Sequence, residues 1–337
     1  MASLSPYWIV GIGFLLIALG VIFATTLASP ASGPRRARGG VLKIGIVGNG
    51  ILGSTHAKFA RIASLDVETY DVLPERSSVA SLEALADRDL ILVCVNTPPG
   101  QDGQTCDTSQ VESVCGQLDA AAKMTGRRLA VLIKSTIILG AFERIEAACS
   151  NLALGYSPER LREARPEEDF KAEGFVILSG DESVMLLARD FYQRILPKVE
   201  FHYTNAITAA AVKYALNTAQ ALLVSFANSL FDLTQAGKID WDEFVCLFRL
   251  DPRFTNLPLQ VPGPPDRNGR RYRGWGNSCL PKDSAALSKW AEQHGVQSLV
   301  HLIAVAWHVN RAQREESSWD CIAAAHAKGG GSHDTIQ

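Results

Sequence analysis

The hydrophobic positions of the chain form short, β-rich apolar runs that alternate with longer stretches of helical character. Leu42–Val47, Val67–Tyr70, Asp89–Val95 and Leu129–Ile133 are such runs. Apolar runs of this length are typical of parallel strands that helices cover on both faces. The pattern therefore predicts an α/β fold built on a Rossmann-like parallel sheet.

A second pattern follows the predicted sheet. Residues 204–236 are rich in Ala and Leu and end at Gly237, which predicts one long helix, and residues 296–314 have helical character as well. We therefore divide the chain into an N-terminal segment with a linker at 1–40, a Rossmann-like domain at 41–200, an all-α central domain at 201–315 and a tail at 316–337.

The first apolar run is of a different kind. Trp8–Ala28 contains no charged side chain, and Arg35, Arg36 and Arg38 follow it. A helix rises ~1.5 Å per residue, so this run is long enough to cross a bilayer core of ~30 Å. The position of the arginines predicts a single-pass membrane protein whose remaining domains face the cytoplasm. A cleaved signal peptide and a buried segment are the alternatives.

Composition narrows the range of functions. The net charge is −2, so no general positive field is present to attract a phosphate backbone, and we expect no nucleic-acid partner. The 7 cysteines form no CxxC pair, which indicates neither a zinc site nor a disulfide framework. Chemistry on a small molecule in a reducing compartment is the better expectation.

A glycine-rich motif directly follows the first predicted strand and precedes a helix-compatible stretch: Gly48, Asn49, Gly50, Ile51, Leu52 and Gly53. In such a motif the glycines allow a tight turn, approach of a pyrophosphate and close packing of helix on strand. Asp71 ends the second strand, where a carboxylate binds the ribose of NAD. The motif predicts an NAD site, the alternative being a simple glycine turn.

Polar residues also follow the third and fourth strands. Thr97 and Thr136 stand there, and ligands of open α/β sheets bind beyond the carboxyl ends of strands. We therefore expect both threonines to contact the cofactor. A hydroxyl that caps a helix is the alternative for each of them.

Candidate chemistry lies in the second half of the chain. Lys213 and Asn217 are one turn apart on the predicted long helix and could together donate hydrogen bonds to an oxyanion. Further on, Cys279 stands in a glycine-containing loop four residues before Asp283, which offers a nucleophile and a base. A solvated helix face is the alternative for the first pair.

These segments together resemble the UDP-glucose/GDP-mannose dehydrogenases, which are nucleotide-sugar 6-dehydrogenases. The resemblance runs from about residue 43 to 311 and consists of ordered motifs: GNGILG, VNTPPGQDGQTCD, IKSTIILG, YSPERLREA, AAAVKYALNTAQALLVSFANSL and GWGNSCLPKD. It implies that the C6 primary alcohol of a nucleotide sugar similar to UDP-glucose is oxidised to a carboxylate with NAD.

The resemblance also implies roles for particular residues. Cys279 would form a thiohemiacetal and then a thioester, Lys213 and Asn217 would stabilise oxyanions, and Thr136, Asp283 and Glu159 would position or activate water. Substrate contacts are implied for Glu159, Arg160, Leu161, Lys213, Asn217, Arg253 and Gly276. A homodimer formed through the long helix is implied as well, with Arg253 reaching across it in many members.

The chain departs from the family pattern in several places. The interval between Asp71 and Ile91 is short, which predicts a narrower sheet. Only 54 residues follow Asp283, so we expect a shortened form without the C-terminal UDP-binding domain. Asn277 replaces a glycine, and residues 266–273 add a basic segment that either grips a diphosphate or is a solvated loop. A catalytically weak, membrane-tethered remnant that acts as an interaction protein or partner subunit, and a dehydrogenase of a smaller alcohol or hydroxy acid, are the rival functions.

Overall fold

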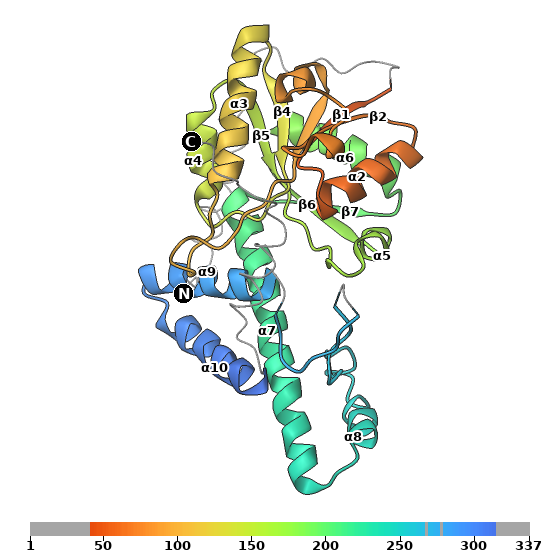
Figure 1. Cartoon of the computed structure of the whole chain (residues 1–337), viewed down its shortest axis with the longest axis vertical. Coiled ribbons are helices and arrows are strands. Elements are labelled where there is room, and N and C mark those ends of the chain that lie inside the picture. Colours follow the sequence, from red (N-terminus) through yellow and green to blue (C-terminus); the bar gives the residue numbers. More distant parts are fainter. Residues whose placement is uncertain (1–40, 267–268, 277–278, 315–337) are drawn as a thin grey trace, which may run out of the picture. The chain divides into compact units, whose positions relative to one another are not determined.

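The computed structural model describes residues 41–266, 269–276 and 279–314 (Figure 1). The predicted membrane segment at residues 8–28, the tail at 316–337 and Asn277 lie outside these residues. Among the helices that are described, none combines the length and the apolar character that crossing a bilayer requires.

One sheet of seven strands organises the first part of the described chain, in the order β2-β1-β3-β4-β5-β6-β7. The strands from β2 to β5 are parallel neighbours, β6 is antiparallel to β5, and β7 is parallel to β6. The strands are β1 Lys43–Val47, β2 Asp66–Tyr70, β3 Leu90–Val93, β4 Leu129–Ile133, β5 Leu152–Tyr156, β6 Phe175–Gly180 and β7 Glu200–Tyr203. The predicted Rossmann-like sheet is confirmed, and β7 carries it just past the predicted boundary at residue 200.

Helices cover both faces of this sheet (Figure 1). On one face the core includes side chains of α3 and α4, and on the other it includes side chains of α2 and α6 together with Phe170 of α5. The bounds are α2 Ile51–Ile62, α3 Ser109–Thr125, α4 Ala141–Ala148, α5 Pro166–Lys171 and α6 Glu182–Ile195. The fully buried strands β3, β4 and β5 explain why their sequences are apolar on both faces.

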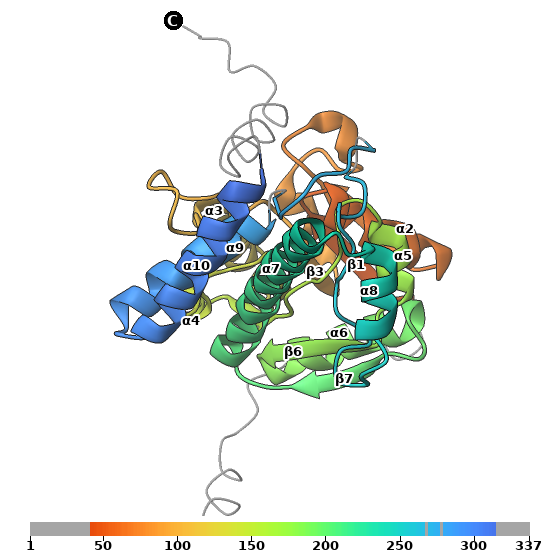
Figure 2. The same cartoon turned by 90° about the horizontal axis from the view of Figure 1, so that it is seen from below.

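The helical part begins with the long predicted helix, α7 Ala206–Gly237. Asn205 caps it by accepting a hydrogen bond from the main-chain N–H of Thr208 at 2.8 Å. Its first turns pack against the sheet, and further along it contacts α9 Cys279–Gln293 and α10 Gln297–Gln313 (Figure 2). α8 Trp241–Phe248 packs against its last turns. The predicted helical central domain is therefore confirmed.

The crossover from β2 to β3 is short, as the interval between Asp71 and Ile91 predicted. It contains two 3₁₀ helices, Pro74–Arg76 and Leu82–Asp87, and no strand, so β2 is an edge strand of the sheet. In the doubly wound order a further strand lies beyond the second one. This sheet lacks that strand and is therefore narrower on the β2 side than the doubly wound sheet.

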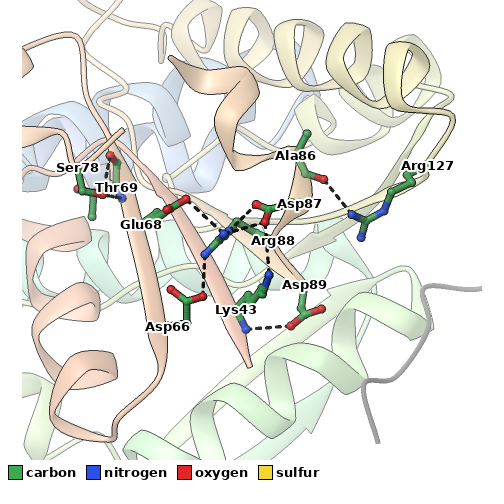
Figure 3. A network of polar contacts seen from close by, with 10 residues as sticks. All are labelled: Lys43, Asp66, Glu68, Thr69, Ser78, Ala86, Asp87, Arg88, Asp89 and Arg127. Atoms are coloured by element: carbon green, nitrogen blue, oxygen red, sulfur yellow. Dashed lines mark hydrogen bonds and ion pairs between the residues drawn. The ribbon is translucent and has the colours of Figure 1, made fainter. Parts of the chain in front are cut away.

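Arg88 lies at the end of this crossover, just before β3, close to the amino ends of the first strands (Figure 3). Its guanidinium lies 2.7 Å from Asp87, 3.1 Å from Asp66 and 3.5 Å from Glu68, although the side chain is only 7% exposed. Its Cγ would lie 3.1 Å from a Cβ at Gly45, so β1 carries a glycine where the arginine stem crosses it. One buried cation thus neutralises carboxylates from two segments.

Replacing Arg88 with methionine is expected to lower the free energy of unfolding by about 1–3 kcal/mol, because three neighbouring carboxylates lose their shared cation. Urea unfolding followed by circular dichroism measures the change. The control is Lys58→Met, which removes an exposed pair with Glu167 and is expected to have a much smaller effect, because solvent screens this pair. Equal effects of the two substitutions would contradict the role given to Arg88.

Candidate active site

The glycine loop has the geometry that its sequence predicts. Gly48 has φ +87°, and a Cβ there would lie 2.8 Å from the main chain of Cys94. A Cβ at Gly53 would collide with the carbonyl oxygen of Gly48, so this glycine permits close packing of α2 on β1. A Cβ at Gly50 would meet nothing within 4 Å, which leaves open space for a ligand.

The amino end of α2 is free to receive an anion. No side chain caps it, and no acidic residue lies in its first turn, which contains Ile51 and Leu52. The first N–H groups of a helix have no intrahelical partners, and the helix dipole favours negative charge there. The loop and this helix end therefore fit the pyrophosphate of a dinucleotide.

Asp71 lies at the end of β2, beside the glycine loop. Its carboxylate accepts hydrogen bonds from the main-chain N–H of Asn49 at 2.7 Å and of Leu73 at 3.0 Å. A carboxylate oxygen has two lone pairs, so each oxygen retains one for a ribose hydroxyl. Asp71 thus shapes the loop, a contribution that the sequence did not reveal, and ribose binding by Asp71 stays a prediction.

Thr97 and Thr136 follow β3 and β4, which are adjacent in the sheet. The Ser135 hydroxyl donates a hydrogen bond to the carbonyl oxygen of Val95 at 2.7 Å and ties the two strand ends together. Neither threonine caps a helix, because the N-cap of α3 is Thr108 and that of α4 is Gly140. The capping alternative is therefore wrong for both, and cofactor contact stays a prediction.

A first polar cluster surrounds Glu159. One of its carboxylate oxygens, Oε2, lies 3.4 Å from Lys134 Nζ and 3.4 Å from His56 Nε2. Burial on its own would raise the pKa of this carboxyl. The charge of Lys134, that of His56 when protonated, the hydrogen bond from the Arg160 N–H and the charge of Lys213 outweigh it and hold the pKa below its usual value. Glu159 is therefore ionised at neutral pH, as a base must be.

Glu159 also lines a pocket together with Lys213, Arg160 and Lys134. Arg160 is not free in this structure: its guanidinium pairs with Glu173, donates to the carbonyl oxygen of Phe175 at 2.6 Å and stacks on that ring. Leu161 is not part of the pocket lining and packs against the core on the α2 face of the sheet. Of the residues implied to contact the substrate, Glu159, Arg160 and Lys213 line this pocket, and Leu161 does not.

A second polar cluster surrounds Asp283, which is 1% exposed. One carboxylate oxygen accepts a hydrogen bond from the Asn217 amide at 2.6 Å, and the other lies 2.5 Å from Lys282 Nζ. Burial alone would lower the pKa of Lys282, but the adjacent Asp283 carboxylate raises it well above its usual value. Lys282 Nζ also lies 4.0 Å from the Cys106 sulfur, which in turn contacts the carbonyl oxygen of Thr136.

Lys213 and Asn217 connect the two clusters, since they lie one turn apart on α7. Lys213 lines the pocket beside Glu159, whereas the amide of Asn217 donates to Asp283. The solvated-face alternative is wrong, because Lys213 is 8% exposed and Asn217 is half-buried. The Asn217 N–H that bonds to Asp283 is engaged within the protein, so joint donation to an oxyanion stays a prediction.

Cys279 is the first residue of α9, and its thiol is exposed. The sequence suggested a loop position, but the helix begins at this residue, and a helix amino end stabilises negative charge. Asp283 lies one turn further along α9, where its buried carboxylate is already engaged by Asn217 and Lys282. This arrangement favours a structural and orienting role for Asp283 over that of an exposed base.

The segment before Cys279 is clamped between α7 and α10. Asn310 is fully buried, accepts a hydrogen bond from the Trp275 N–H at 2.7 Å and donates one to the Trp275 carbonyl oxygen at 2.9 Å. The Asn228 side chain accepts from the Gly274 N–H at 3.1 Å. A Cβ at Gly276 would lie 2.8 Å from the Arg314 guanidinium, so glycine lets this guanidinium pack closely on the main chain here. Substrate contact by Gly276 stays a prediction.

Arg253, and Arg270 and Arg273 of the basic segment, have charged partners of their own. Arg253 is exposed and pairs with Asp251, so within one chain it contacts neither Glu159 nor Asp283. In the basic segment Arg273 pairs with Asp232 at 2.6 Å and Arg270 lies 3.7 Å from Asp266. Binding of a substrate by either group stays a prediction.

Sequence reasoning missed several members of the two clusters, and it missed Asn310, which holds the segment before Cys279. Lys134 and Lys282 lie directly beside predicted residues, inside the motifs quoted above, and this adjacency was the available signal. His56, Tyr192 and Asn310 lie in ordinary helical sequence, where nothing distinguishes them from other polar helix residues. Their role depends on contacts between segments more than 30 residues apart.

The glycine loop, the open amino end of α2 and the polar strand ends define a dinucleotide-dependent oxidoreductase fold. A model of the NAD binding domain of the UDP-glucose/GDP-mannose dehydrogenase family matches residues 76–196, and a model of that family's central domain matches residues 207–312. The chain belongs to the UDP-glucose/GDP-mannose dehydrogenase family, and NAD is the cofactor of its sheet domain.

Individual relatives agree with this assignment. The chain is 28% identical to the UDP-glucose 6-dehydrogenase of Rhizobium meliloti, with 72% of this chain and 54% of the relative aligned. It is 26% identical to the GDP-mannose 6-dehydrogenase of Pseudomonas aeruginosa, over 64% and 49% of the two chains. The UDP-glucose dehydrogenase structure from Pyrobaculum islandicum superimposes with a TM-score of 0.70 at 25% identity, covering 82% of this chain and 70% of that one. The chain spans about half the length of the curated relatives it matches.

Substitution of Gly50 by alanine is expected to weaken NAD binding about tenfold or more while leaving the melting temperature nearly unchanged, because the new methyl group enters space open to the ligand and touches no protein atom. Fluorescence titration with NADH measures the affinity. The matched control is Gly116→Ala in α3, a position with equally open surroundings outside the cofactor loop. Unchanged affinity in the Gly50 variant would remove the loop from the cofactor site.

Proposed function

We propose that this protein oxidises the C6 primary alcohol of a nucleotide sugar similar to UDP-glucose to the carboxylate, through a thiohemiacetal and a thioester on Cys279. The observation that carries the proposal is the placement of Lys213 and Asn217 on α7, between an ionised Glu159 and the buried Asp283 beside the start of α9. Family membership supports the reaction class.

NAD, when bound, supplies the oxidising power by accepting a hydride from the sugar carbon in each of the two oxidations. The Cys279 sulfur, as the thiolate, attacks the aldehyde carbon. The Lys213 ammonium offers a donor to the oxyanion that forms. Asp283 holds Asn217 and Lys282 in position around this centre.

Release of the acid requires an activated water molecule. Glu159 is suited to accept a proton from it, because its carboxylate is ionised, lines the pocket and faces Lys213. Thr136, at the end of β4, is a candidate for orienting this water. Asp283 is less suited to the task, because both of its oxygens are engaged.

We also propose a homodimer formed through α7. This helix exposes large apolar side chains at Ile207, Val212, Leu216, Phe226 and Leu233. Exposed apolar patches on one element indicate an interaction surface. The family resemblance supports a second copy of the chain as the partner, and the exposed Arg253 is available to such a copy.

Membrane attachment through residues 8–28 stays a prediction. The full chain is expected to sediment with membranes and to remain there at alkaline pH, whereas a chain without residues 1–40 is expected in the supernatant. Cell fractionation followed by immunoblotting measures the distribution. Membrane association of both forms would place the attachment elsewhere in the chain.

Cys279→Ser is expected to abolish formation of the sugar acid, by at least about a thousandfold, because serine does not form the thioester. The assay follows NADH production by the full chain with UDP-glucose, GDP-mannose and UDP-N-acetylhexosamines in separate reactions, with two NADH expected per acid. Cys246→Ser, at an exposed cysteine in α8, is the matched control. Full product from Cys279→Ser would exclude the covalent route, and wild-type turnover of a small alcohol alone would favour the rival dehydrogenase.

A further inference from the structure

A fully buried histidine connects the cofactor helix to Glu159. His56 lies on α2, one turn beyond the glycine loop, and its side chain has no exposed surface. Its Nδ1 lies 2.9 Å from the carbonyl oxygen of Leu52, and its Nε2 lies 3.0 Å from the Tyr192 hydroxyl and 3.4 Å from Glu159 Oε2.

The partners of the ring assign its protons. A carbonyl oxygen only accepts hydrogen bonds, so Nδ1 carries the proton. Burial lowers the pKa of His56 to about 4, which makes the ring neutral at pH 7. Its Nε2 is therefore an acceptor, directed at Tyr192 and at the carboxylate of Glu159.

The separation of His56 and Glu159 fits this assignment. Two acceptors that share no proton stay apart, and 3.4 Å is longer than a normal hydrogen bond. Tyr192 currently donates to Nε2, and its hydroxyl also lies within hydrogen-bonding reach of Ser157, which accepts from Lys134 at 3.1 Å. Tyr192 can turn to Ser157 and so release the single lone pair of Nε2.

We propose that His56 is a positioning residue that accepts a hydrogen bond from Glu159 once this side chain has taken up a proton as a base. The O–H bond of the water or sugar hydroxyl breaks, an O–H bond forms at Glu159 Oε2, and this hydrogen points at His56 Nε2 without being transferred to it. The acid form of Glu159 is stabilised, so Glu159 becomes a stronger base. This inference rests on the proposed function.

Other titratable groups surround the pair. Lys134 follows β4 and Cys94 follows β3. Tyr192 projects from α6, Lys213 lies on α7, and Glu173 pairs with Arg160. Lys134 and Lys213 favour the ionised form of Glu159, and Glu173 disfavours it when charged. A protonated His56 would also favour the ionised form, but its ring is neutral at pH 7. The variants below leave all of these groups in place, so a change in the pH profile reports the His56 contact.

His56→Phe removes the acceptor and is expected to move the acid limb of the kcat/KM profile by about half to one unit toward lower pH, the equivalent of one net hydrogen bond. The rate on the plateau is expected to fall about fivefold, because Glu159 becomes a weaker base. His56→Gln retains an oxygen acceptor and is expected to lie close to the wild type.

The matched control is Thr55→Val on the same helix. Thr55 is 4% exposed and bonds only to the Ile51 carbonyl oxygen, so its loss can lower stability but leaves the acid limb in place. An acid limb that is the same in His56→Phe and the wild type would overturn the proposal. So would an equal displacement of the limb in Thr55→Val.

A second experiment does not depend on enzymatic turnover. Nitrogen NMR of labelled histidines, assigned by difference with His56→Gln, is expected to find the His56 proton on Nδ1 at pH 7. Glu159→Gln imitates the protonated carboxyl, because its amide N–H can donate, and is expected to move the Nε2 resonance in the direction of hydrogen bonding. A proton on Nε2 in the wild type, or an unmoved resonance in Glu159→Gln, would overturn the inference. A wild type that oxidises no nucleotide sugar would refute the proposed function. The NMR experiment would still show whether His56 accepts a hydrogen bond from residue 159.

Discussion

The buried carboxylate of Asp283 is the interaction on which the helical half of the site depends. At 1% exposure it would be unstable as a lone charge, and it is stabilised only because Asn217 and Lys282 bind its two oxygens. Asn217 lies on α7 and Asp283 on α9, so the same contact fixes the start of α9, and with it Cys279, relative to α7. Loss of Lys282 would leave an uncompensated buried carboxylate, whereas loss of Asn217 would leave one carboxylate oxygen without its hydrogen-bond donor.

α7 connects the contact between Asn217 and Asp283 to the sheet. Its first turns are part of the sheet core through Ala206, Ala210 and Tyr214, while Lys213 lies beside Glu159 at the pocket. The following turn holds Asn217 against Asp283. One helix therefore sets the distance between Glu159, the proposed base, and the start of α9, where the proposed nucleophile Cys279 lies. Rigid elements hold reacting groups more accurately than loops do.

The two polar clusters stabilise their buried charges in different ways. Around Glu159 the charge of Lys134 is combined with neutral acceptors and donors, including His56 and Tyr192. Around Asp283 one carboxylate, one ammonium and one amide are directly bonded. Glu159 can accept a proton without breaking an ion pair as short as 2.5 Å. Asp283 cannot, because its contact with Lys282 has that length. We therefore propose acid–base chemistry for Glu159 and an orienting role for Asp283.

Sequence alone determined the features that depend on local spacing. Apolar runs predicted β1 to β4, the glycines at 48, 50 and 53 predicted the dinucleotide loop, and the Ala- and Leu-rich stretch predicted α7, because each of these patterns depends on neighbouring residues. The strands β5, β6 and β7 were not predicted. The tertiary structure decided the rest. It turned Asn217 toward Asp283, placed Arg160 on Glu173 and brought His56 to Glu159, more than 100 residues away. Such contacts depend on how distant elements pack, and no local pattern encodes them.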